Sequence, residues 1–347
     1  MAKTTPGRAT LKKLAAELGV SVTTVSRALG GYPDVAESTR SRIVEASERH
    51  QYVSNSAAKM LVTGRSGFVS LLMPLHTPML DPFLGEFVAG LSEGLNARDR
   101  HLFIATAPDP ESEINVLKRM VESGQADAVI LNRVAETDAR VEFLLERQFP
   151  FIAHGRTLEN QQDFSWIDTD GEWAFAEAFR LLYDGGHRQF GLLSISEHMT
   201  FRHLREQGIE NAIVDADDSQ ITLETSHVPR FDVAARTAAI TAMLSSPKRP
   251  TAILALTDEL ALSVIQQAAN MNIRIPDELS VIGFDNIPSA AYVPPGLTTF
   301  DQSIRVTAQE IVRVLVDNID GIASAQQRII RPILIERGSH GAFVNAN

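Results

Sequence analysis

The sequence predicts an α/β protein with a small all-α domain in front of a large body of doubly wound parallel sheets. Its 347 residues are enough for two or three domains at about 100–200 residues each. The first 65 residues carry ten Lys/Arg and five Asp/Glu, a net charge of +5, whereas the rest carries 22 basic and 38 acidic residues, a net charge of −16. From residue 67 onward, short apolar runs alternate with helical stretches, as in repeated β-α units.

The first domain is predicted to contain three short helices. Thr10 is a good N-cap for a helix over 11–18, and the glycine that follows suits a helix end. A second helix is expected over 22–29, and a third from Ser38 or Thr39. Two short helices joined by a tight turn and supported by a third form the helix-turn-helix pattern, in which the second helix enters the DNA major groove.

The outward side chains of the second helix are short enough for a groove, and one arginine can bind a phosphate or a guanine edge. We expect the DNA contacts of this domain to come from Thr10, Val22, Thr23, Thr24, Ser26 and Arg27. A three-helix bundle could equally be a protein-interaction module, but the positive charge favours double-stranded DNA. Because one such domain reads few bases, we expect a homodimer on a palindromic operator.

The body is predicted to consist of parallel strands covered by helices on both faces. Strands are expected at 68–73, 102–105, 128–131, 151–153, 190–193, 252–256 and 279–284. Helices are expected at 83–98, 111–123, 138–147, 171–185, 232–245, 258–271 and 303–319. One sheet would be very long for a body of roughly 280 residues, so two lobes are predicted.

Polar side chains follow several of these strands, where ligands of parallel sheets bind. They are Asn132, His154, Arg156, Asp258 and Asp285. Gln302 follows the run Leu297-Thr-Thr-Phe300, and Arg205 is expected near the start of a helix. Such groups suit the hydroxyls of a sugar, and Phe83 or Phe231 can stack on its ring. Structural alternatives stay open: helix N-caps for Asp258 and Asp285, a surface ion pair for Arg205, the core for Phe83 and Phe231, a cap for Gln302.

The run from Thr10 to Gly30 resembles the DNA-binding domain of LacI-family transcriptional regulators, and Val-Ser-x-x-Thr-Val-Ser-Arg at 20–27 is highly specific to them. The resemblance covers nearly the whole chain and implies a body similar to a periplasmic sugar-binding protein, with two lobes and three crossovers. The crossovers are placed near 155–165, 288–297 and 321–328. The implied domains are a helix-turn-helix domain (1–54), a hinge helix and linker (55–66) and an effector-binding and dimerisation domain (67–347). Lobe 1 is placed at 67–158 and 296–322, and lobe 2 at 159–295 and 323–343.

By the same resemblance, the hinge helices of two subunits pair in the DNA minor groove. Asn55 can cap this helix, and Leu61 is implied to be the wedge that opens a base step, with Ala58 and Lys59 beside it. An isolated helix of two turns is marginal in water, so it needs a partner to persist. A plain tether is the alternative interpretation.

The resemblance also implies which residues bind the effector: Asp81, Phe83, Asn132, Arg205, Phe231, Asp285 and Gln302. The chain departs from the family pattern twice. Asp81 stands where the family has Asn before Pro-Phe, and His154-Gly155-Arg156 stands where many relatives have Asp-Arg. One carboxylate is therefore missing, and His154 or Arg156 is expected to take its place.

Several classes of function are excluded or disfavoured. Without cysteine there is no disulfide, Cys-bound zinc or thiol nucleophile, and the nine histidines lack ligand spacing. No nucleotide-binding or metalloprotease motif is present, so no cofactor, metal or enzymatic activity is expected. No apolar run approaches the roughly 20 residues of a membrane span, and no signal peptide precedes the body, so a cytoplasmic protein without membrane contact is expected. The sequence thus predicts a repressor controlled by a small carbohydrate-like effector between the lobes. A sugar-binding transport protein and a sugar-processing enzyme are the alternatives.

Overall fold

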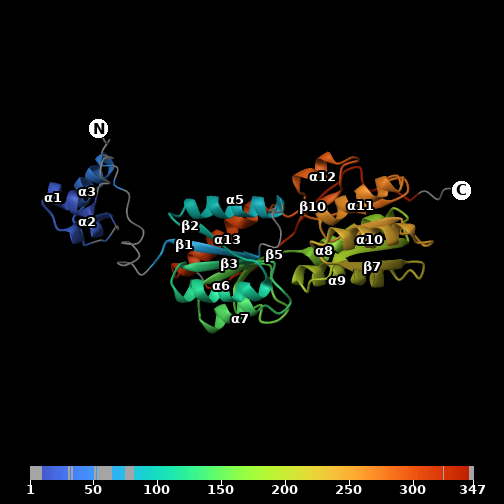
Figure 1. Cartoon of the computed structure of the whole chain (residues 1–347), viewed down its shortest axis with the longest axis horizontal. Helices are drawn as coiled ribbons and strands as arrows, with labels where there is room; N and C mark the ends of the chain where they lie inside the picture. The colour runs from blue at the N-terminus through green and yellow to red at the C-terminus, as the bar shows by residue number, and fades with distance from the viewer. Residues whose placement is uncertain are drawn as a thin grey trace. The chain divides into compact units, whose positions relative to one another are not determined.

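The computed structural model describes residues 10–29, 32, 34–50, 52, 65–74, 82–322 and 324–343 (Figure 1). The chain divides into two compact units, which meet in sequence between Ser66 and Gly67. Among the described residues, no helix combines the length and the apolar character that crossing a membrane requires.

The first unit packs its helices around a small apolar core. Its described helices are α1 (Leu11–Leu18), α2 (Val22–Leu29) and α3 (Glu37–Arg49). Leu14, Val25 and Ile43 are almost fully buried where these helices meet. The predicted start of the third helix is slightly wrong: α3 begins at Glu37, before Ser38 and Thr39, and its N-cap residue makes no side-chain bond.

The first lobe of the second unit is a parallel sheet with strand order β11-β5-β4-β3-β1-β2. Its strands are β1 (Phe68–Pro74), β2 (His101–Ala107), β3 (Ala128–Asn132), β4 (Phe151–His154), β5 (Ser165–Thr169) and β11 (Gln327–Ile330). Two helix pairs cover its two faces: α5 (Pro82–Asn96) with α13 (Ile304–Ile319), and α6 (Pro110–Glu122) with α7 (Ala139–Glu146) (Figure 1). The apolar central strands β1, β3 and β4 are therefore buried on both sides, whereas the edge strands β2 and β11 are largely exposed.

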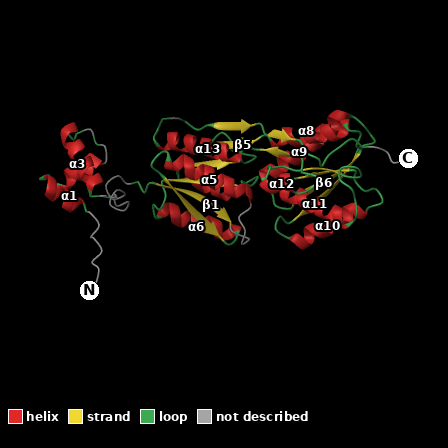
Figure 2. Ribbon diagram, turned by 90° about the horizontal axis from the view of Figure 1, so that it is seen from above, coloured by secondary structure: helices red, strands yellow, loops and turns green. Residues whose placement is uncertain are grey.

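The second lobe repeats this arrangement with strand order β7-β6-β8-β9. Its strands are β6 (Gln189–Ile195), β7 (Thr222–Val228), β8 (Ala252–Ala255) and β9 (Ser280–Ile282). Helices α8 (Gly171–Asp184) and α9 (Thr200–Ala216) lie on one side of the sheet, and α10 (Val233–Ser245) and α11 (Asp258–Asn270) on the other (Figure 2). The short helix α12 (Pro288–Tyr292) follows, and β10 (Thr299–Asp301) pairs antiparallel with β12 (Ile333–Ile335) in a separate two-stranded sheet.

The lobe boundaries predicted from the sequence are wrong at the first and third crossovers. Residues 155–165 do not leave lobe 1, because β5 follows them and pairs with β4. Residues 321–328 do not cross either, because β11 pairs with β5 and the chain turns toward β12 only after Ile330. The predicted second crossover at 288–297 holds α12, and Thr298 still bridges to Ile282 of lobe 2. The crossing segments are thus displaced by a few residues toward the C-terminus.

The fold class itself is confirmed. Of the strands that the prediction missed, β5, β7 and β11 contain many polar residues and so lack the apolar run of a buried strand, whereas β12 is only three residues long. The predicted helix ranges do not include α9, although Arg205 is expected near the start of a helix, and Gly208 marks the close contact of α9 with α8. A β-carbon at Gly208 would lie 2.1 Å from the Glu172 carbonyl oxygen, so only glycine allows this approach.

Candidate functional site: an interlobe cleft and a helix-turn-helix surface

A cleft with a cavity volume of about 70 Å³ opens between the two lobes, beyond the carboxyl ends of β3, β4 and β5. Seven predicted effector residues line it: Phe83, Asn132, His154, Arg156, Arg205, Asp285 and Gln302. Asp81 lies outside the described residues. Phe231 does not line this cleft; it lies beside a second cavity. Most of the side chains expected from their place after parallel strands therefore lie around one space.

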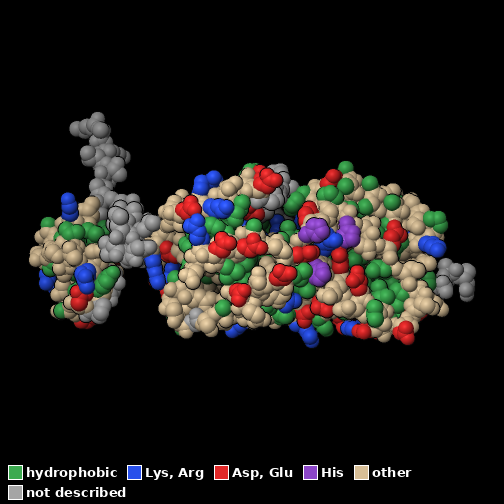
Figure 3. Space-filling view, turned by 90° about the horizontal axis from the view of Figure 1, so that it is seen from below, with side chains coloured by type: hydrophobic (Ala, Val, Ile, Leu, Met, Phe, Trp, Pro, Cys, Tyr) green, Lys and Arg blue, Asp and Glu red, His purple; other side chains and the backbone are tan. Residues whose placement is uncertain are grey.

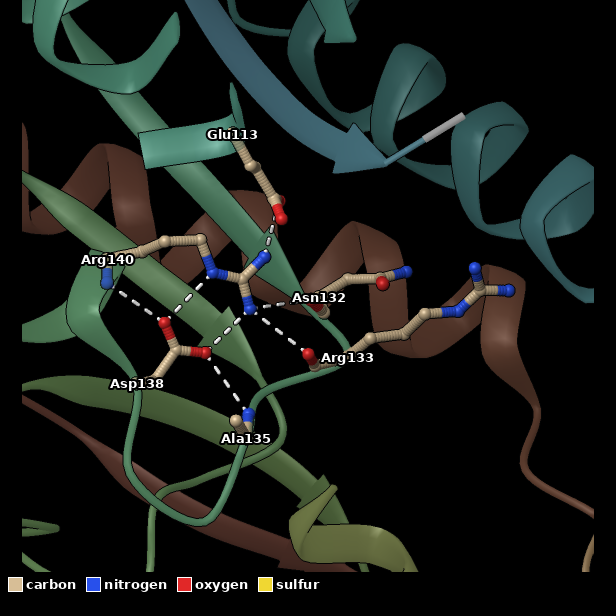
Figure 4. A network of polar contacts seen from close by, with 6 residues as sticks. All are labelled: Glu113, Asn132, Arg133, Ala135, Asp138 and Arg140. Carbon is tan, nitrogen blue, oxygen red and sulfur yellow. Dashed lines mark hydrogen bonds and ion pairs between the residues drawn. The ribbon is translucent and has the colours of Figure 1, made fainter. Parts of the chain in front are cut away.

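One wall of the cleft is the loop after β3, which a buried arginine holds in place (Figure 4). Arg140 of α7 binds Asp138 at 2.9 and 2.6 Å and Glu113 of α6 at 2.6 Å. Its Nη2 also donates to the carbonyl oxygens of Asn132 and Arg133, at 3.3 and 3.0 Å. Burial alone would lower the pKa of Arg140, but the hydrogen bonds and charges of Asp138 and Glu113 raise it above its usual value.

This network fixes the direction of two neighbouring side chains. In Figure 4 the Asn132 amide and the Arg133 guanidinium both extend away from the Arg140 network. Both residues line the cleft. The sequence predicts Asn132 from its place at the end of a strand, but it gives no comparable signal for Arg133.

Beside the cleft, the backbones of the two lobes pair directly. Ala135 of lobe 1 and Met199 of lobe 2 form an antiparallel bridge. The Thr200 amide donates to the Val134 carbonyl oxygen at 3.1 Å, and the Glu136 amide donates to the His198 carbonyl oxygen at 3.2 Å. We call residues 134–136 and 198–200 the interlobe seam. Because side chains alternate along extended backbone, Val134 and Thr200 line the cleft, whereas Ala135 and Met199 line the second cavity.

Phe231 lines the second cavity and not the cleft. This residue lies in the segment between β7 and α10, on the same side of the interlobe seam as Met199. Phe231 is 39% exposed, so it is not a core residue either. Its neighbour Arg230 lines both the cleft and the second cavity.

Asp285 and Gln302 form the far side of the cleft and act together. The Gln302 amide donates to Asp285 at 2.5 Å, and its carbonyl oxygen accepts from the Thr169 hydroxyl at 2.8 Å. Neither residue caps a helix, since Ile287 and Ser303 hold the N-cap positions of α12 and α13. Asp285 has a φ of 117°, a costly conformation for a residue other than glycine, which is typical of functional sites.

Asp258 neither lines the cleft nor caps a helix, the two roles expected from its place after a strand. Thr257 is the N-cap of α11, and Asp258 is the first residue of the helix. The Asp258 carboxylate is buried and accepts from the Thr299 hydroxyl at 2.6 Å and from the Ile287 amide at 2.9 Å. It therefore holds the segment around Asp285 from behind the cleft wall.

Arg205 lies deep in the cleft wall and is not a surface residue. Its Nη1 donates to the Leu256 carbonyl oxygen at 2.5 Å, and its guanidinium lies 3.7 Å from the centre of the Phe284 ring. Burial lowers the pKa of Arg205 to about 10, although the charges of Asp285 and Asp168 oppose this. Arg205 remains a cation at neutral pH.

Burial shifts the pKa values of the neighbouring residues His154 and Asp168 in opposite directions. The His154 ring contacts Phe87 and Phe83, and burial together with the charge of Arg205 lowers its pKa to about 4. Burial raises the pKa of Asp168 to about 6, opposed by Arg156, whose Nε lies 3.3 Å from its carboxylate. The sequence reasoning missed Asp168 because it missed β5; polar residues ending a short strand were the available signal.

Several buried polar atoms of the cleft have no hydrogen-bond partner among the described residues. They include the Asn132 Nδ2, His154 Nε2, Thr200 Oγ1 and Arg205 Nε atoms, and the Arg156 Nε atom, which has only its ion pair with Asp168. Buried polar groups are normally paired, so a cluster of unpaired ones around one space indicates a place for a polar ligand. No group of three His, Asp or Glu side chains in the described part of the chain is placed to hold a metal ion.

The first unit presents a short polar surface at the start of α2. Val22 and Thr23 are exposed, whereas Thr24 and Ser26 are half-buried; Thr10 is exposed and caps α1. The Arg27 guanidinium is bound to Asp34 at 3.2 and 2.8 Å and lies over the Tyr32 ring. To contact DNA, the Arg27 guanidinium must therefore weaken or break its ion pair with Asp34. Asn55, Ala58, Lys59 and Leu61 lie outside the described residues.

A helix-turn-helix unit joined to a two-lobed unit with a polar interlobe cleft defines a ligand-responsive DNA-binding regulator. Residues 10–55 match the family described as bacterial regulatory proteins, lacI family, and residues 179–340 match a periplasmic binding protein-like domain. The chain is 34% identical to the HTH-type transcriptional regulator AglR of Rhizobium meliloti, over 95% of this chain and 94% of that protein. It belongs to the LacI family of transcriptional regulators, as the sequence resemblance implies.

Other relatives and solved structures agree. The HTH-type transcriptional repressor CytR of Escherichia coli K12 is 26% identical over 96% of this chain and 97% of that protein. The structure of the transcriptional regulator CelR in complex with cellobiose has a TM-score of 0.71 at 25% identity, covering 96% of this chain and all of that one. The lac repressor dimer bound to operator and an anti-inducer has a TM-score of 0.81 at 20% identity and the same coverage, which shows the shared fold.

Proposed function

We propose that this protein is a repressor whose affinity for a palindromic operator is set by a small carbohydrate-like effector in the interlobe cleft. The observation that carries the proposal is the set of unpaired buried atoms on Asn132, His154, Thr200 and Arg205 around one space. Sugar hydroxyls both donate and accept hydrogen bonds, so one ring can satisfy several of these groups at once. The effector residues proposed here are Phe83, Asn132, His154, Arg156, Arg205, Asp285 and Gln302.

The DNA-binding surface in this proposal is the start of α2, with Val22, Thr23 and Thr24 facing base edges in the major groove. Arg27 binds phosphate after exchanging its bond with Asp34. Leu61, with Asn55, Ala58 and Lys59, is proposed as the minor-groove element. The acidic side chains spread over the visible face of the larger unit disfavour nonspecific DNA contact there (Figure 3). Operator affinity is therefore expected to fall steeply with added salt.

The operator-binding species is proposed to be a homodimer. Strand β2 forms one edge of the lobe 1 sheet, and its Phe103 and Ile104 are 40% and 41% exposed. Together with Val116 and Met120 of α6, they line an open groove. An exposed apolar sheet edge can pair with another chain, and a second copy would cover it.

The CelR and AglR relatives are regulators, and we propose no catalytic activity and no cofactor for this chain.

The proposed mechanism is linkage between the cleft and the hinge. An effector that binds both lobes changes the equilibrium between interlobe arrangements, including the interlobe seam. This alters the spacing of the two hinge segments of a dimer and therefore operator affinity. Couplings of this kind are typically about 1–3 kcal/mol and are reciprocal.

The test measures fluorescence anisotropy of labelled genomic fragments with the full-length protein, with and without a panel of sugars. One fragment is expected to bind specifically, and one sugar to change that affinity by roughly 5–150-fold. Asp285→Ala is expected to retain operator binding and lose the response, because Asp285 orients Gln302 in the cleft. Failure to prefer any fragment over random duplex would favour a transport-type binding protein, and turnover of a bound sugar would establish an enzyme.

A further inference from the structure

The guanidinium of Arg27, in the last turn of α2, is bound by a carboxylate from the segment between α2 and α3. Its Nε donates to one Asp34 oxygen at 3.2 Å, and its Nη2 lies 2.8 Å from the other oxygen. Its face lies over the Tyr32 ring, 4.8 Å from the ring centre. One carboxylate thus occupies two donors of the guanidinium, in the same two-point arrangement with which arginine binds phosphate.

The fold holds Asp34 in this position. The Tyr32 amide donates to the Arg27 carbonyl oxygen at 3.1 Å, and the Tyr32 carbonyl oxygen accepts from Arg40 of α3 at 2.7 Å. On the other side of Asp34, Val35 is buried in the core of the first unit. The carboxylate therefore belongs to a segment that is fixed on both sides, beside the end of α2.

The ion pair is fully charged at neutral pH. The hydrogen bond and the charge of Asp34 raise the pKa of Arg27 above its usual value. The hydrogen bond from Arg27 in turn lowers the pKa of Asp34 below its usual value. Each group stabilises the charged form of the other, so the Arg27 charge is compensated within the chain before any DNA is bound.

The pair is also accessible for exchange. The Arg27 and Asp34 side chains are 43% and 54% exposed. Exposed ion pairs contribute little to stability, so a DNA phosphate can replace the carboxylate. The exchange is nevertheless less favourable than a contact from an unpaired arginine. Arg27 gives up one anion to gain another, and the released Asp34 carboxylate stays close to a negatively charged duplex.

We propose that Asp34 limits the DNA affinity of the helix-turn-helix domain by competing with DNA phosphate for Arg27. The proposal rests on the proposed function, since it concerns the same DNA-binding surface. Each domain then binds duplex more weakly than its basic residues alone would allow. Stable binding therefore requires both domains of a dimer at once, and this joint binding is what an effector in the cleft is proposed to control.

The test measures the affinity of the full-length protein for a labelled duplex of random sequence, by fluorescence anisotropy at low ionic strength. Asp34→Asn is expected to bind the duplex about two- to fivefold more tightly for each engaged domain, the range that corresponds to an exposed ion pair. The gain is expected to shrink as potassium chloride is added, because salt screens exposed charges. A gain of affinity cannot arise from misfolding of the domain.

Two comparisons separate competition for Arg27 from a general effect of charge. Glu48→Gln removes one negative charge from an exposed residue of α3 and is the matched control, with a smaller gain expected. In an Arg27→Gln background, Asp34→Asn is expected to have no larger effect than Glu48→Gln, because no guanidinium remains to be released.

The proposal is overturned if the gain from Asp34→Asn equals that from Glu48→Gln, or if it persists in the Arg27→Gln background. Unchanged binding by Asp34→Asn would refute it as well, and weaker binding would show that the carboxylate orients Arg27 for DNA instead of competing for it. All of these results leave the proposed function standing. If neither the wild type nor Asp34→Asn binds the duplex, the proposed DNA-binding function fails together with this inference.

Discussion

His154 shows how one buried side chain makes the stability of this protein depend on pH. Its pKa is about 4 in the folded chain and near 6.5 when exposed. Between these values the unfolded chain binds a proton that the folded chain does not, so stability falls as the pH drops from 6.5 to 4. Asp168, with its pKa raised to about 6, has the opposite effect between pH 3.8 and 6.

Replacing His154 separates its contribution to the pH dependence of stability from that of Asp168. Relative to His154→Gln, the wild type is expected to lose up to about 3 kcal/mol of unfolding free energy between pH 6.5 and 4, because each pKa unit corresponds to about 1.4 kcal/mol. Urea unfolding at a series of pH values measures this. His198→Gln, at an exposed histidine, is the control. Parallel pH profiles for the wild type and His154→Gln would show that His154 is not held neutral.

At the scale of elements, the loop after β3 depends on α7 for its shape. Arg140 joins α7 to two carbonyl groups of this loop and to α6, through a network of buried charges. Arg140→Met is expected to cost about 3–5 kcal/mol in urea unfolding, because it leaves Asp138 and Glu113 buried without their cation. Adding Asp138→Asn should recover part of the loss. A single variant as stable as the wild type would refute the role of the network.

The interlobe seam is a second feature at this scale, and the absence of cysteine makes it easy to test. Bridge partners in antiparallel strands have Cα atoms about 4.5–5.5 Å apart, which lies within the range that a disulfide spans. The double variant Ala135→Cys/Met199→Cys is expected to form a disulfide and to lose the effector response when oxidised, with recovery on reduction. The two single variants are controls. An unaltered response in protein shown by mass spectrometry to be oxidised would exclude opening of the seam from the mechanism.

For the whole molecule, the exposed edge of the lobe 1 sheet predicts how subunits associate. Phe103→Glu puts a charge on the apolar part of β2 and is expected to shift the dimer to monomer in analytical ultracentrifugation. Operator affinity should fall at least about tenfold, since one helix-turn-helix domain contacts only half of a palindrome. Tyr292→Glu, at an exposed aromatic residue of α12, controls for added surface charge. A Phe103→Glu protein that remains dimeric would place the interface elsewhere.

The sequence predicts this molecule unevenly, for physical reasons. Apolar strands and the helix-turn-helix pattern are local signals, so the fold class and family are predicted correctly. Strand β5 was not predicted because Asp168, which lines the cleft, interrupts its apolar run. Because β5 was missed, the lobe crossovers were placed too early in the chain. Arg133 and Arg230 escape because their place at the cleft depends on how two lobes meet, which no local pattern records. Phe231 is displaced to the second cavity for the same reason.

The discontinuous lobes also govern the order in which a newly made chain can fold. The first lobe needs α13 and β11, and a β-carbon at Gly90 of α5 would lie 2.3 Å from the Arg305 carbonyl oxygen, so α13 fits tightly against a helix made more than 200 residues earlier. The second lobe needs the final segment, where Ser339 accepts from the Val281 amide and Gly341 contacts His187. Neither lobe can be completed until almost the entire chain has left the ribosome. During synthesis, the helix-turn-helix domain is therefore the one part that can finish folding early.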